Sequence, residues 1–219
     1  MPTTAARAGW AGIPAEDRKA ARRVRLLDAA FELLGSEGWS ATTVRAVCQA
    51  AQLNPRYFYE SFEDLDGLVV AVYDRTVEEL AGVVFGTADA AGPDPASQVR
   101  AVLERIVDFV ADDPRRGRVL YVEALGNEAL NRRRIEAGHQ LVVLLERGAA
   151  ERFGRPPEGE RIGRIAAAFL VGGFGELLRG WLDGRIDVPK AQLVDDASAL
   201  FLAIGEAADR IATSRRRPR

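Results

Sequence analysis

Apolar residues near the start of the chain recur every three or four positions, the spacing that places side chains on one face of an α-helix. This stripe predicts a helix over residues 15–35, with its apolar face formed by Val24, Leu27, Phe31 and Leu34. The segment GSEGW follows, and its glycines suit the left-handed residue that commonly ends a helix.

Two short helices are predicted next, separated by a tight turn around Gln52. The first begins after Thr43, whose hydroxyl suits an N-cap, and its inward face holds Val44, Val47, Cys48 and Ala51. The second has Asn54 as its cap and Pro55 at its first position, where a missing N–H costs nothing. It ends near Ser61.

The rest of the pattern is also helical. A fourth helix, capped by Asp64, runs to about Gly82 with an apolar side of Leu65, Leu68, Val69 and Val72. After the break GTADAAGPDPAS, helical segments are predicted over residues 95–112, 114–125, 127–153, 158–183 and 188–214. No strand pattern occurs, so the predicted fold class is all-α with about nine helices.

Two helices joined by a tight turn form the helix-turn-helix pattern, whose second helix lies in the major groove of DNA. Here that helix carries three adjacent rings, Tyr57, Phe58 and Tyr59, which cannot all face inward. We expect Phe58 and Phe62 to face the core and the two tyrosines to point elsewhere. A phenol can donate to phosphate and lie on a sugar or a thymine methyl.

The same features also have an interpretation without DNA. Amphipathic helix pairs with a short turn are common, and most of them bind no nucleic acid. The tyrosines would then be half-buried packing residues, and the basic run near the N-terminus would be a solvated face.

Composition and charge narrow the class of protein. The 219 residues are 47% hydrophobic with a formal net charge of −2, which is ordinary for a globular protein of one large or two small domains. Five bases occur without an acid in one short run, namely Arg18, Lys19, Arg22, Arg23 and Arg25. Beside a DNA backbone this run would add affinity that depends on salt and not on sequence.

Other features bear on metals and on location. One cysteine and one histidine are too few for a disulfide or an ordinary structural zinc site, so we expect no metal and no cofactor. The longest apolar stretches, such as AAAFLVGGF, are too short to span a bilayer. The start MPTTAARAG lacks the apolar segment of a signal peptide. We therefore expect a cytoplasmic protein without a membrane partner.

In the order of its motifs, the segment from about residue 22 to 73 resembles the TetR family of bacterial transcriptional regulators. The resemblance is carried by EGW, Thr42-Thr43, Val47-Cys48, Ala51-Gln52-Leu53, Asn54, Tyr59 and Ser61-Phe62. It implies a three-helix DNA-binding domain followed by a larger helical domain for ligand binding and dimerisation. It also implies a regulator, more specifically a repressor, which binds palindromic operator DNA as a homodimer and is released by a small-molecule effector.

The resemblance assigns DNA-binding roles by position. Thr43 matches an N-cap that touches phosphate, Arg45 a base-reading position, and Tyr59 a phosphate-contacting tyrosine. The start of the recognition helix matches Asn54, Pro55, Arg56 and Tyr57. Leu65 replaces a lysine that usually opens the fourth helix, so only its backbone N–H, helped by the helix dipole, would hold phosphate.

Three further positions depart from the family pattern. Gln52 replaces the glycine of the turn, so a backbone conformation usually given to glycine must accept a side chain. Glu60 follows the phosphate-contacting tyrosine and would repel DNA if it faced it. Ser61 replaces a histidine.

The last two helices carry apolar stripes that we interpret as a dimer interface, built as a four-helix bundle with a second copy. Glycines in the first of them favour the close approach of another helix or a ligand, since each carries a propensity cost of roughly 1 kcal/mol. Packing within one subunit also uses part of both stripes. The candidate interface residues are Phe169, Gly172, Gly173, Leu177, Leu193, Ala197, Leu200 and Ile204.

The segments between the fourth helix and the last two helices hold the candidate effector pocket, since apolar walls with a few polar anchors are typical of small-molecule sites. Its candidate lining is Phe109, Tyr121, Asn127, His139 and Trp181, each of which is also compatible with a plain core or surface role. The expected organisation is a flexible tail (1–14), a helix-turn-helix domain (15–63), a connecting helix (64–82), an effector and dimerisation domain (83–214) and a basic tail (215–219).

Two other functions remain open. A helical dimer that has lost DNA binding would keep the small-molecule site, and Glu60 and Leu65 favour this alternative. An enzyme would need convergent catalytic groups, whereas the carboxylates are scattered and no glycine-rich phosphate loop or metal-ligand spacing occurs. We therefore do not expect an enzyme.

Overall fold

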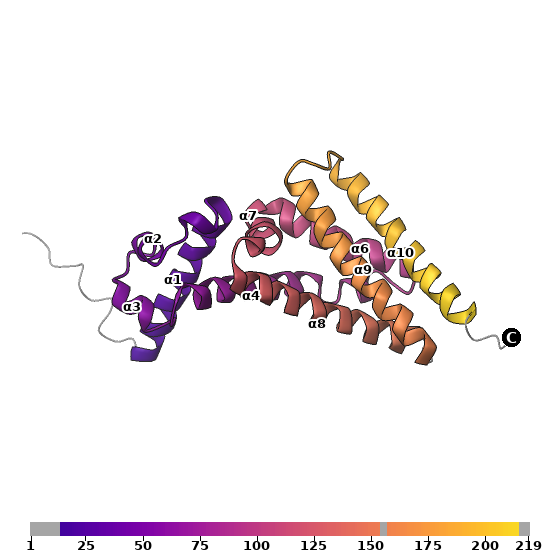
Figure 1. The fold of residues 1–219 in the computed structure, drawn as a ribbon, viewed down its shortest axis with the longest axis horizontal. Helices are drawn as coiled ribbons and strands as arrows, with labels where there is room; N and C mark the ends of the chain where they lie inside the picture. The colour runs from indigo at the N-terminus through magenta and orange to yellow at the C-terminus, as the bar shows by residue number, and fades with distance from the viewer. Residues whose placement is uncertain (1–13, 154–156, 215–219) are drawn as a thin grey trace, which may run out of the picture. The chain divides into compact units, whose positions relative to one another are not determined.

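The structure is a computed structural model, which describes residues 14–153 and 157–214. The chain forms two compact units, unit 1 from Met1 to Val72 and unit 2 from Tyr73 to Arg219. Throughout the described ranges the regular elements are helices (Figure 1), which confirms the predicted all-α fold class.

Unit 1 contains α1 (Ala15–Ser36), a 3-10 turn (Trp39–Ala41), α2 (Val44–Ala50), α3 (Pro55–Tyr59) and the start of α4 (Leu65–Val84). The three predicted caps are confirmed. Oγ1 of Thr43 accepts the N–H of Ala46 at 3.1 Å, and Oδ1 of Asn54 accepts that of Arg56 at 2.9 Å. Oδ1 of Asp64 accepts the N–H of Gly67 at 2.7 Å at the start of α4.

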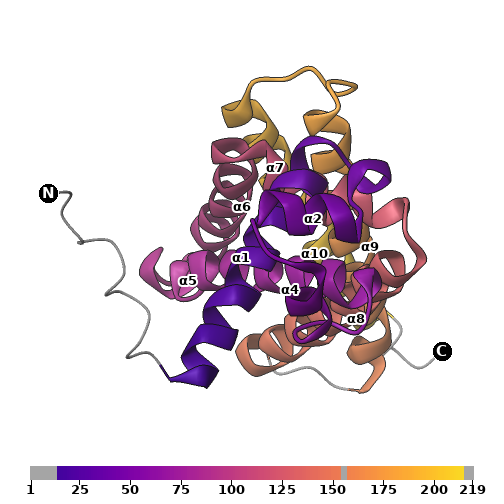
Figure 2. The same cartoon turned by 90° about the vertical axis from the view of Figure 1, so that its left-hand side faces the viewer.

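The core of unit 1 is where α1 meets α2 and α3, which Figure 2 shows from the side of these helices. Its fully buried side chains include Leu26, Leu34, Val47 and Phe58. The predicted stripe on α1 is wrong at Val24, which is 52% exposed. The buried face runs instead through Leu26, Ala29, Ala30 and Leu34.

Unit 2 begins within α4 and continues through α5 (Thr87–Ala90), α6 (Pro95–Asp112), α7 (Pro114–Gly117), η2 (Arg118–Val122) and η3 (Glu123–Leu125). It ends with α8 (Glu128–Phe153), α9 (Pro157–Leu182) and α10 (Lys190–Ser214). The single turn α5 lies in a segment predicted to be a break. The helix predicted over residues 114–125 is divided into α, π and 3-10 turns.

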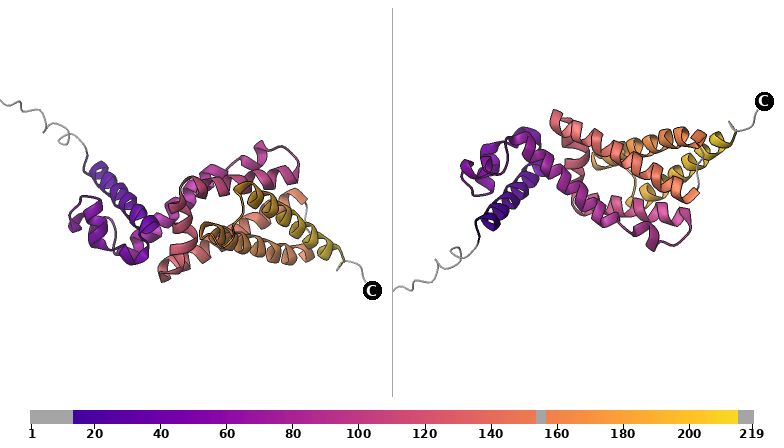
Figure 3. Two further views of the ribbon diagram at one scale, coloured as in Figure 1. Left: turned by 90° about the horizontal axis from the view of Figure 1, so that it is seen from above. Right: turned by 90° about the horizontal axis from the view of Figure 1, so that it is seen from below.

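In unit 2, α9 packs between α8 and α10, and α10 also packs on α6 (Figures 1 and 3). Fully buried side chains at the centre of this bundle include Val107, Val110, Val119, Leu130 and Leu178. Within the described part of the chain, α9 alone is long and apolar enough to cross a membrane, with a mean hydropathy of 1.4 over a window that is 22% buried. One such helix is weak evidence for a membrane span, and this one carries an outward apolar face.

Candidate nucleic-acid interface and neighbouring sites

The three adjacent rings of α3 separate as predicted, because successive residues of a helix point in different directions. Phe58 is fully buried, and its ring lies edge-on to that of Tyr59 with centroids 5.2 Å apart. Phe62 is also buried, whereas Tyr57 is 37% exposed and Tyr59 is 62% exposed. The short recognition helix is therefore anchored by phenylalanine and presents tyrosine to its surroundings.

The other DNA-binding candidates, except Leu65, lie at the starts of the two short helices α2 and α3. Thr43 and Arg45 are exposed at the start of α2, and Asn54, Pro55 and Arg56 are exposed at the start of α3. Leu65 is half-buried at the first position of α4, where the Asp64 carboxylate occupies the helix end. The structure thus gathers seven of the eight candidates as exposed residues of one helix-turn-helix.

The structure confirms that the turn between α2 and α3 places Gln52 in a backbone conformation usually given to glycine. Its φ is 53°, and in the described ranges no other residue except glycine has a positive φ. For an L-residue this left-handed conformation costs roughly 1–2 kcal/mol. The helix-turn-helix backbone is therefore retained here against the preference of its side chain.

Three arginines of the basic run are engaged inside unit 1. Nη1 of Arg23 donates to the carbonyl of Ser61 at 2.9 Å, and its guanidinium lies 4.1 Å from the ring centroid of Phe62. Nη2 of Arg25 donates to the carbonyl of Ala51 at the end of α2. Arg22 pairs with Glu60 at 3.4 Å. Sequence reasoning missed these contacts, which tie α1 to the two short helices.

Glu60 has two arginine partners. Its Oε1 lies 3.1 Å from Nε of Arg56, and its Oε2 lies 3.4 Å from Nη2 of Arg22. The sequence suggested only that this carboxylate would repel DNA. An arginine four residues earlier is a helical ion-pair signal that could have indicated the Arg56 contact.

The effector candidates of unit 2 do not line one common cavity. Phe109 is buried under the guanidinium of Arg116, 4.4 Å from its ring centroid, beside an open cavity of about 380 Å³. His139 is exposed and borders a different surface hollow on α8. Asn127 accepts the N–H of Leu130 at 2.8 Å and so caps α8.

Tyr121 and Trp181 have local structural roles. The ring of Tyr121 is 3.6 Å from the position that a Cβ on Gly175 would occupy, so this glycine of α9 leaves room for η2. Burial raises the pKa of the Tyr121 hydroxyl, and it raises the pKa of Tyr73 to about 12. Nε1 of Trp181 donates to the carbonyl of Val188 at 3.0 Å across the connection between α9 and α10.

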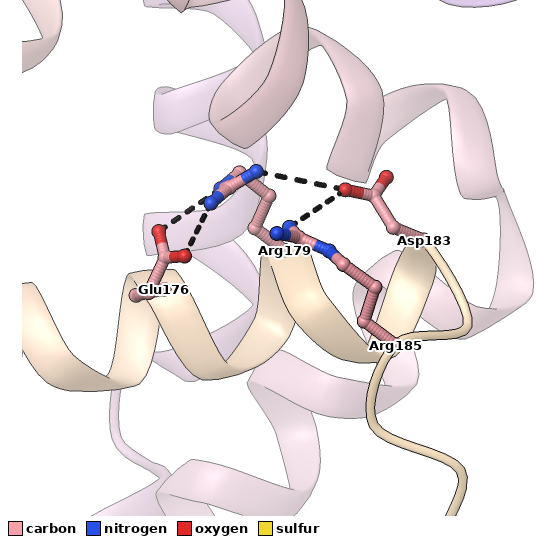
Figure 4. A network of polar contacts seen from close by, with 4 residues as sticks. All are labelled: Glu176, Arg179, Asp183 and Arg185. Carbon is pink, nitrogen blue, oxygen red and sulfur yellow. Dashed lines mark hydrogen bonds and ion pairs between the residues drawn. The ribbon is translucent and has the colours of Figure 1, made fainter.

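An ion-pair cluster lies at the C-terminal end of α9 (Figure 4). Arg179 stands between Glu176 and Asp183, and Asp183 also pairs with Arg185 at 3.0 Å. The hydrogen bonds from Arg179 lower the pKa of Glu176. This cluster holds the end of the helix from which the connection to α10 departs.

The dimer-interface candidates fall into two groups. Leu193 and Ala197 are each 2% exposed, so they pack within the subunit. Phe169 is 70% exposed and Leu200 is 60% exposed, while Leu177 and Ile204 are half-buried. Gly172 and Gly173 are exposed, and a Cβ on either would meet no atom within 4 Å. Packing within the described subunit therefore does not require these two glycines.

Comparisons with known proteins agree on one family. Residues 26–72 match the family model described as bacterial regulatory proteins, tetR family. The HTH-type transcriptional regulator BetI of Burkholderia cenocepacia is 32% identical over 82 residues, which are 37% of this chain and 42% of the relative. BetI of Stenotrophomonas maltophilia is 29% identical over 92 residues, 42% of this chain and 47% of the relative. The matches thus span less than half the length of these relatives.

Solved structures extend the likeness to both units. The fatty acid degradation regulator FadR from Bacillus halodurans has a TM-score of 0.68 at 16% identity, over 83% of this chain and 94% of that one. The multidrug binding protein EbrR, solved with imidazole, has a TM-score of 0.61 at 23% identity, over 82% and 94%. FadR from Bacillus subtilis, solved with stearoyl-CoA, has a TM-score of 0.60 at 14% identity, over 81% and 96%. At these identities the likeness establishes the fold.

Proposed function

The chain belongs to the TetR family of bacterial regulatory proteins, and from this premise we propose that it is a cytoplasmic transcriptional repressor that binds palindromic operator DNA as a homodimer. One observation carries the proposal. The helix-turn-helix of unit 1 anchors Phe58 in the core and leaves Tyr57 and Tyr59 exposed. Exposed phenols on a recognition helix can contact both base edges and phosphates.

The roles on DNA follow from position. Arg45 and Tyr57 read base edges, while Thr43 and Tyr59 hold the backbone. Asn54, Pro55 and Arg56 form the start of the recognition helix, close to the groove. The half-buried Leu65 contributes only its backbone N–H to phosphate, beside the Asp64 carboxylate.

The outward face of α9 and α10 supports the homodimer. Exposed Phe169 and Leu200 offer apolar area, and Gly172 and Gly173 have open space above them. Glycines that the subunit itself does not need are explained by the close approach of a helix from a second copy. Two recognition helices would then be held about one turn of DNA apart, roughly 34–36 Å or a multiple.

A small-molecule effector acts on unit 2 in this proposal. EbrR, solved with imidazole, and FadR, solved with stearoyl-CoA, show that ligands of different chemistry occupy this fold. We expect an apolar or mixed ligand among the helices that carry Phe109, Tyr121 and Trp181. It releases DNA by favouring a spacing of the recognition helices that DNA does not favour. A coupling of about 1–3 kcal/mol is enough for a 5- to 150-fold change in affinity.

An electrophoretic shift assay on DNA flanking the protein's own gene, with a salt titration, tests the function. We expect binding to this DNA that survives salt at which random DNA is released. Equal binding to both would contradict the proposal. A dimer that binds small molecules but no DNA would support the alternative that the fold has lost DNA binding, which Glu60 and Leu65 favour. The family is one of regulators, and an enzymatic activity is not proposed.

A further inference from the structure

Glu60 stands directly after α3 and uses its two oxygens on different arginines. Oε1 pairs with Arg56 one helical turn earlier at 3.1 Å, and Oε2 pairs with Arg22 of α1 at 3.4 Å. The carboxylate that follows the recognition helix is thus balanced inside unit 1 by two cations.

The two arginines are held very differently. The Arg22 side chain is only 16% exposed, and its guanidinium lies 4.5 Å from the ring centroid of Tyr57. The Arg56 side chain is 82% exposed. Packing and the pair with Glu60 together hold Arg22 against the tyrosine, whereas the pair with Glu60 is the contact that restrains Arg56. An exposed pair of this kind is weak, so it lowers the availability of Arg56 to another anion several-fold without abolishing it.

We propose that Glu60 is a positioning residue that sets the DNA specificity of α3, by restraining Arg56 from general phosphate contact and by holding Arg22 against Tyr57. The inference rests on the function proposed above. An unrestrained arginine on the recognition helix would grip phosphate in any sequence. Glu60 competes with phosphate for that arginine. Random DNA is bound through its charge alone, so this competition lowers the affinity for random DNA directly.

A target sequence differs because it adds base contacts. Tyr57 makes these contacts best when its ring has one orientation, and the Arg22 guanidinium that Glu60 holds supports that orientation. The same carboxylate thus weakens binding to random DNA and supports binding to the target. Its measurable effect is on the ratio of the two affinities.

The test uses the full chain and a target duplex selected by the unaltered protein from a pool of random sequences. Affinity for this duplex and for random DNA is measured over a salt series for the parent, Glu60→Gln and Glu63→Gln. Glu63 is the matched control, because it is exposed nearby and its side chain has no hydrogen bond or ion pair within the described residues. Both variants remove one negative charge.

We expect Glu60→Gln to bind random DNA several-fold more tightly and to raise its salt slope by about one, the effect of one added phosphate contact. The ratio of target to random affinity should fall about tenfold, whereas Glu63→Gln should leave the ratio unchanged. Identical behaviour of the two variants would overturn the proposal. If the parent selects no target from the pool, the proposed function itself fails, and the role of Glu60 fails with it.

Arg56→Gln provides a second measurement. In the parent it should change the salt slope on random DNA by much less than one, since Arg56 is restrained there. In the Glu60→Gln background it should lower the slope by about one. Equal losses in both backgrounds would overturn the restraint. If circular dichroism shows that Glu60→Gln does not fold, the single variant Arg56→Gln still tests the proposal. A salt slope on random DNA that is lower than the parent's by about one would overturn the proposed restraint of Arg56.

Discussion

The backbone N–H of Gln52 donates to the carbonyl oxygen of Gln49 at 3.1 Å, and this bond closes the turn after α2 with Gln52 in the left-handed region at φ 53°. Glycine adopts this conformation without a steric cost, whereas glutamine does not. The pair therefore marks a place where the fold overrides the preference of the residue.

Replacing Gln52 by glycine should stabilise unit 1. The relief of strain outweighs the greater freedom that glycine gives the unfolded chain, so we expect a net gain of about 0.5–1 kcal/mol in the free energy of unfolding. Urea denaturation followed by circular dichroism measures it. Gln49→Gly, at an exposed helical position of α2, should lose about 1 kcal/mol and serves as the control. A loss at both positions would contradict the argument.

Arg45→Ala should relax sequence preference, while Tyr59→Phe should weaken binding to all sequences alike. Both side chains are exposed, so neither change should affect folding. We expect Arg45→Ala to cost about 1–3 kcal/mol on the target duplex and much less on random DNA. Competition binding with duplexes that carry single base-pair changes measures the difference. An equal loss for Arg45→Ala on target and random DNA would refute the base-reading role.

Gly173→Leu should separate the dimer without unfolding the subunit. A Cβ at this position would meet no atom of a neighbouring element of the described subunit within 4 Å, so leucine has open space there, but it would force a partner helix away. Analytical ultracentrifugation should show a shift to monomer at unchanged helix content. Gly138→Leu on α8 has the same open surroundings outside the predicted interface, and it should leave the dimer intact. A Gly173→Leu protein that remains dimeric would show that this surface is not the interface.

The sequence predicted local structure well where one residue dominates the choice. Asn54 followed by Pro55 determines the start of α3, and a triplet of rings must leave some of them outside. The all-α class was predictable because apolar residues recur at helical spacing and no strand pattern occurs. The two-helix unit was predictable from its caps and the turn between them. The buried face of α1 was not, because Val24 and Leu26 are both apolar and only the packed neighbours decide between them.

Long-range side-chain contacts were out of reach of sequence patterns. The bonds from Arg22 and Arg23 to residues 38 positions later depend on how α1 crosses α3, which spacing along the chain does not reveal. The effector candidates illustrate the same limit. Phe109 and His139 border separate hollows, and Asn127 is used as a cap, so composition alone did not indicate which of them share a cavity.

The ion-pair cluster at the end of α9 predicts a pH dependence of stability. Arg179 lowers the pKa of Glu176 in the folded protein, so the carboxylate stabilises the fold above its ordinary pKa of about 4.5. This contribution is lost as the pH falls through the lower folded value. The difference in melting temperature between the parent and Glu176→Gln should therefore be constant above about pH 4.5 and shrink below it. A difference that stays constant below about pH 4.5 would contradict the contribution of the Arg179 hydrogen bonds.

Trp181→Phe should reveal how much the indole contributes to the connection between α9 and α10. It removes the donor that binds the Val188 carbonyl at 3.0 Å and leaves most of the ring area in place. We expect a loss of about 1 kcal/mol in the free energy of unfolding. Urea denaturation followed by circular dichroism measures this loss. DNA affinity should be retained.

The control for this measurement is Tyr121→Phe. The Tyr121 hydroxyl makes no hydrogen bond within the described residues, and burial raises its pKa. Removing it leaves no partner unsatisfied, so the change should be close to neutral. A loss at position 121 as large as that at 181 would show that the Val188 bond does not explain the effect. If Trp181→Phe is stable but no longer responds to a ligand found by thermal-shift screening, the indole belongs to the effector site as well as to the connection.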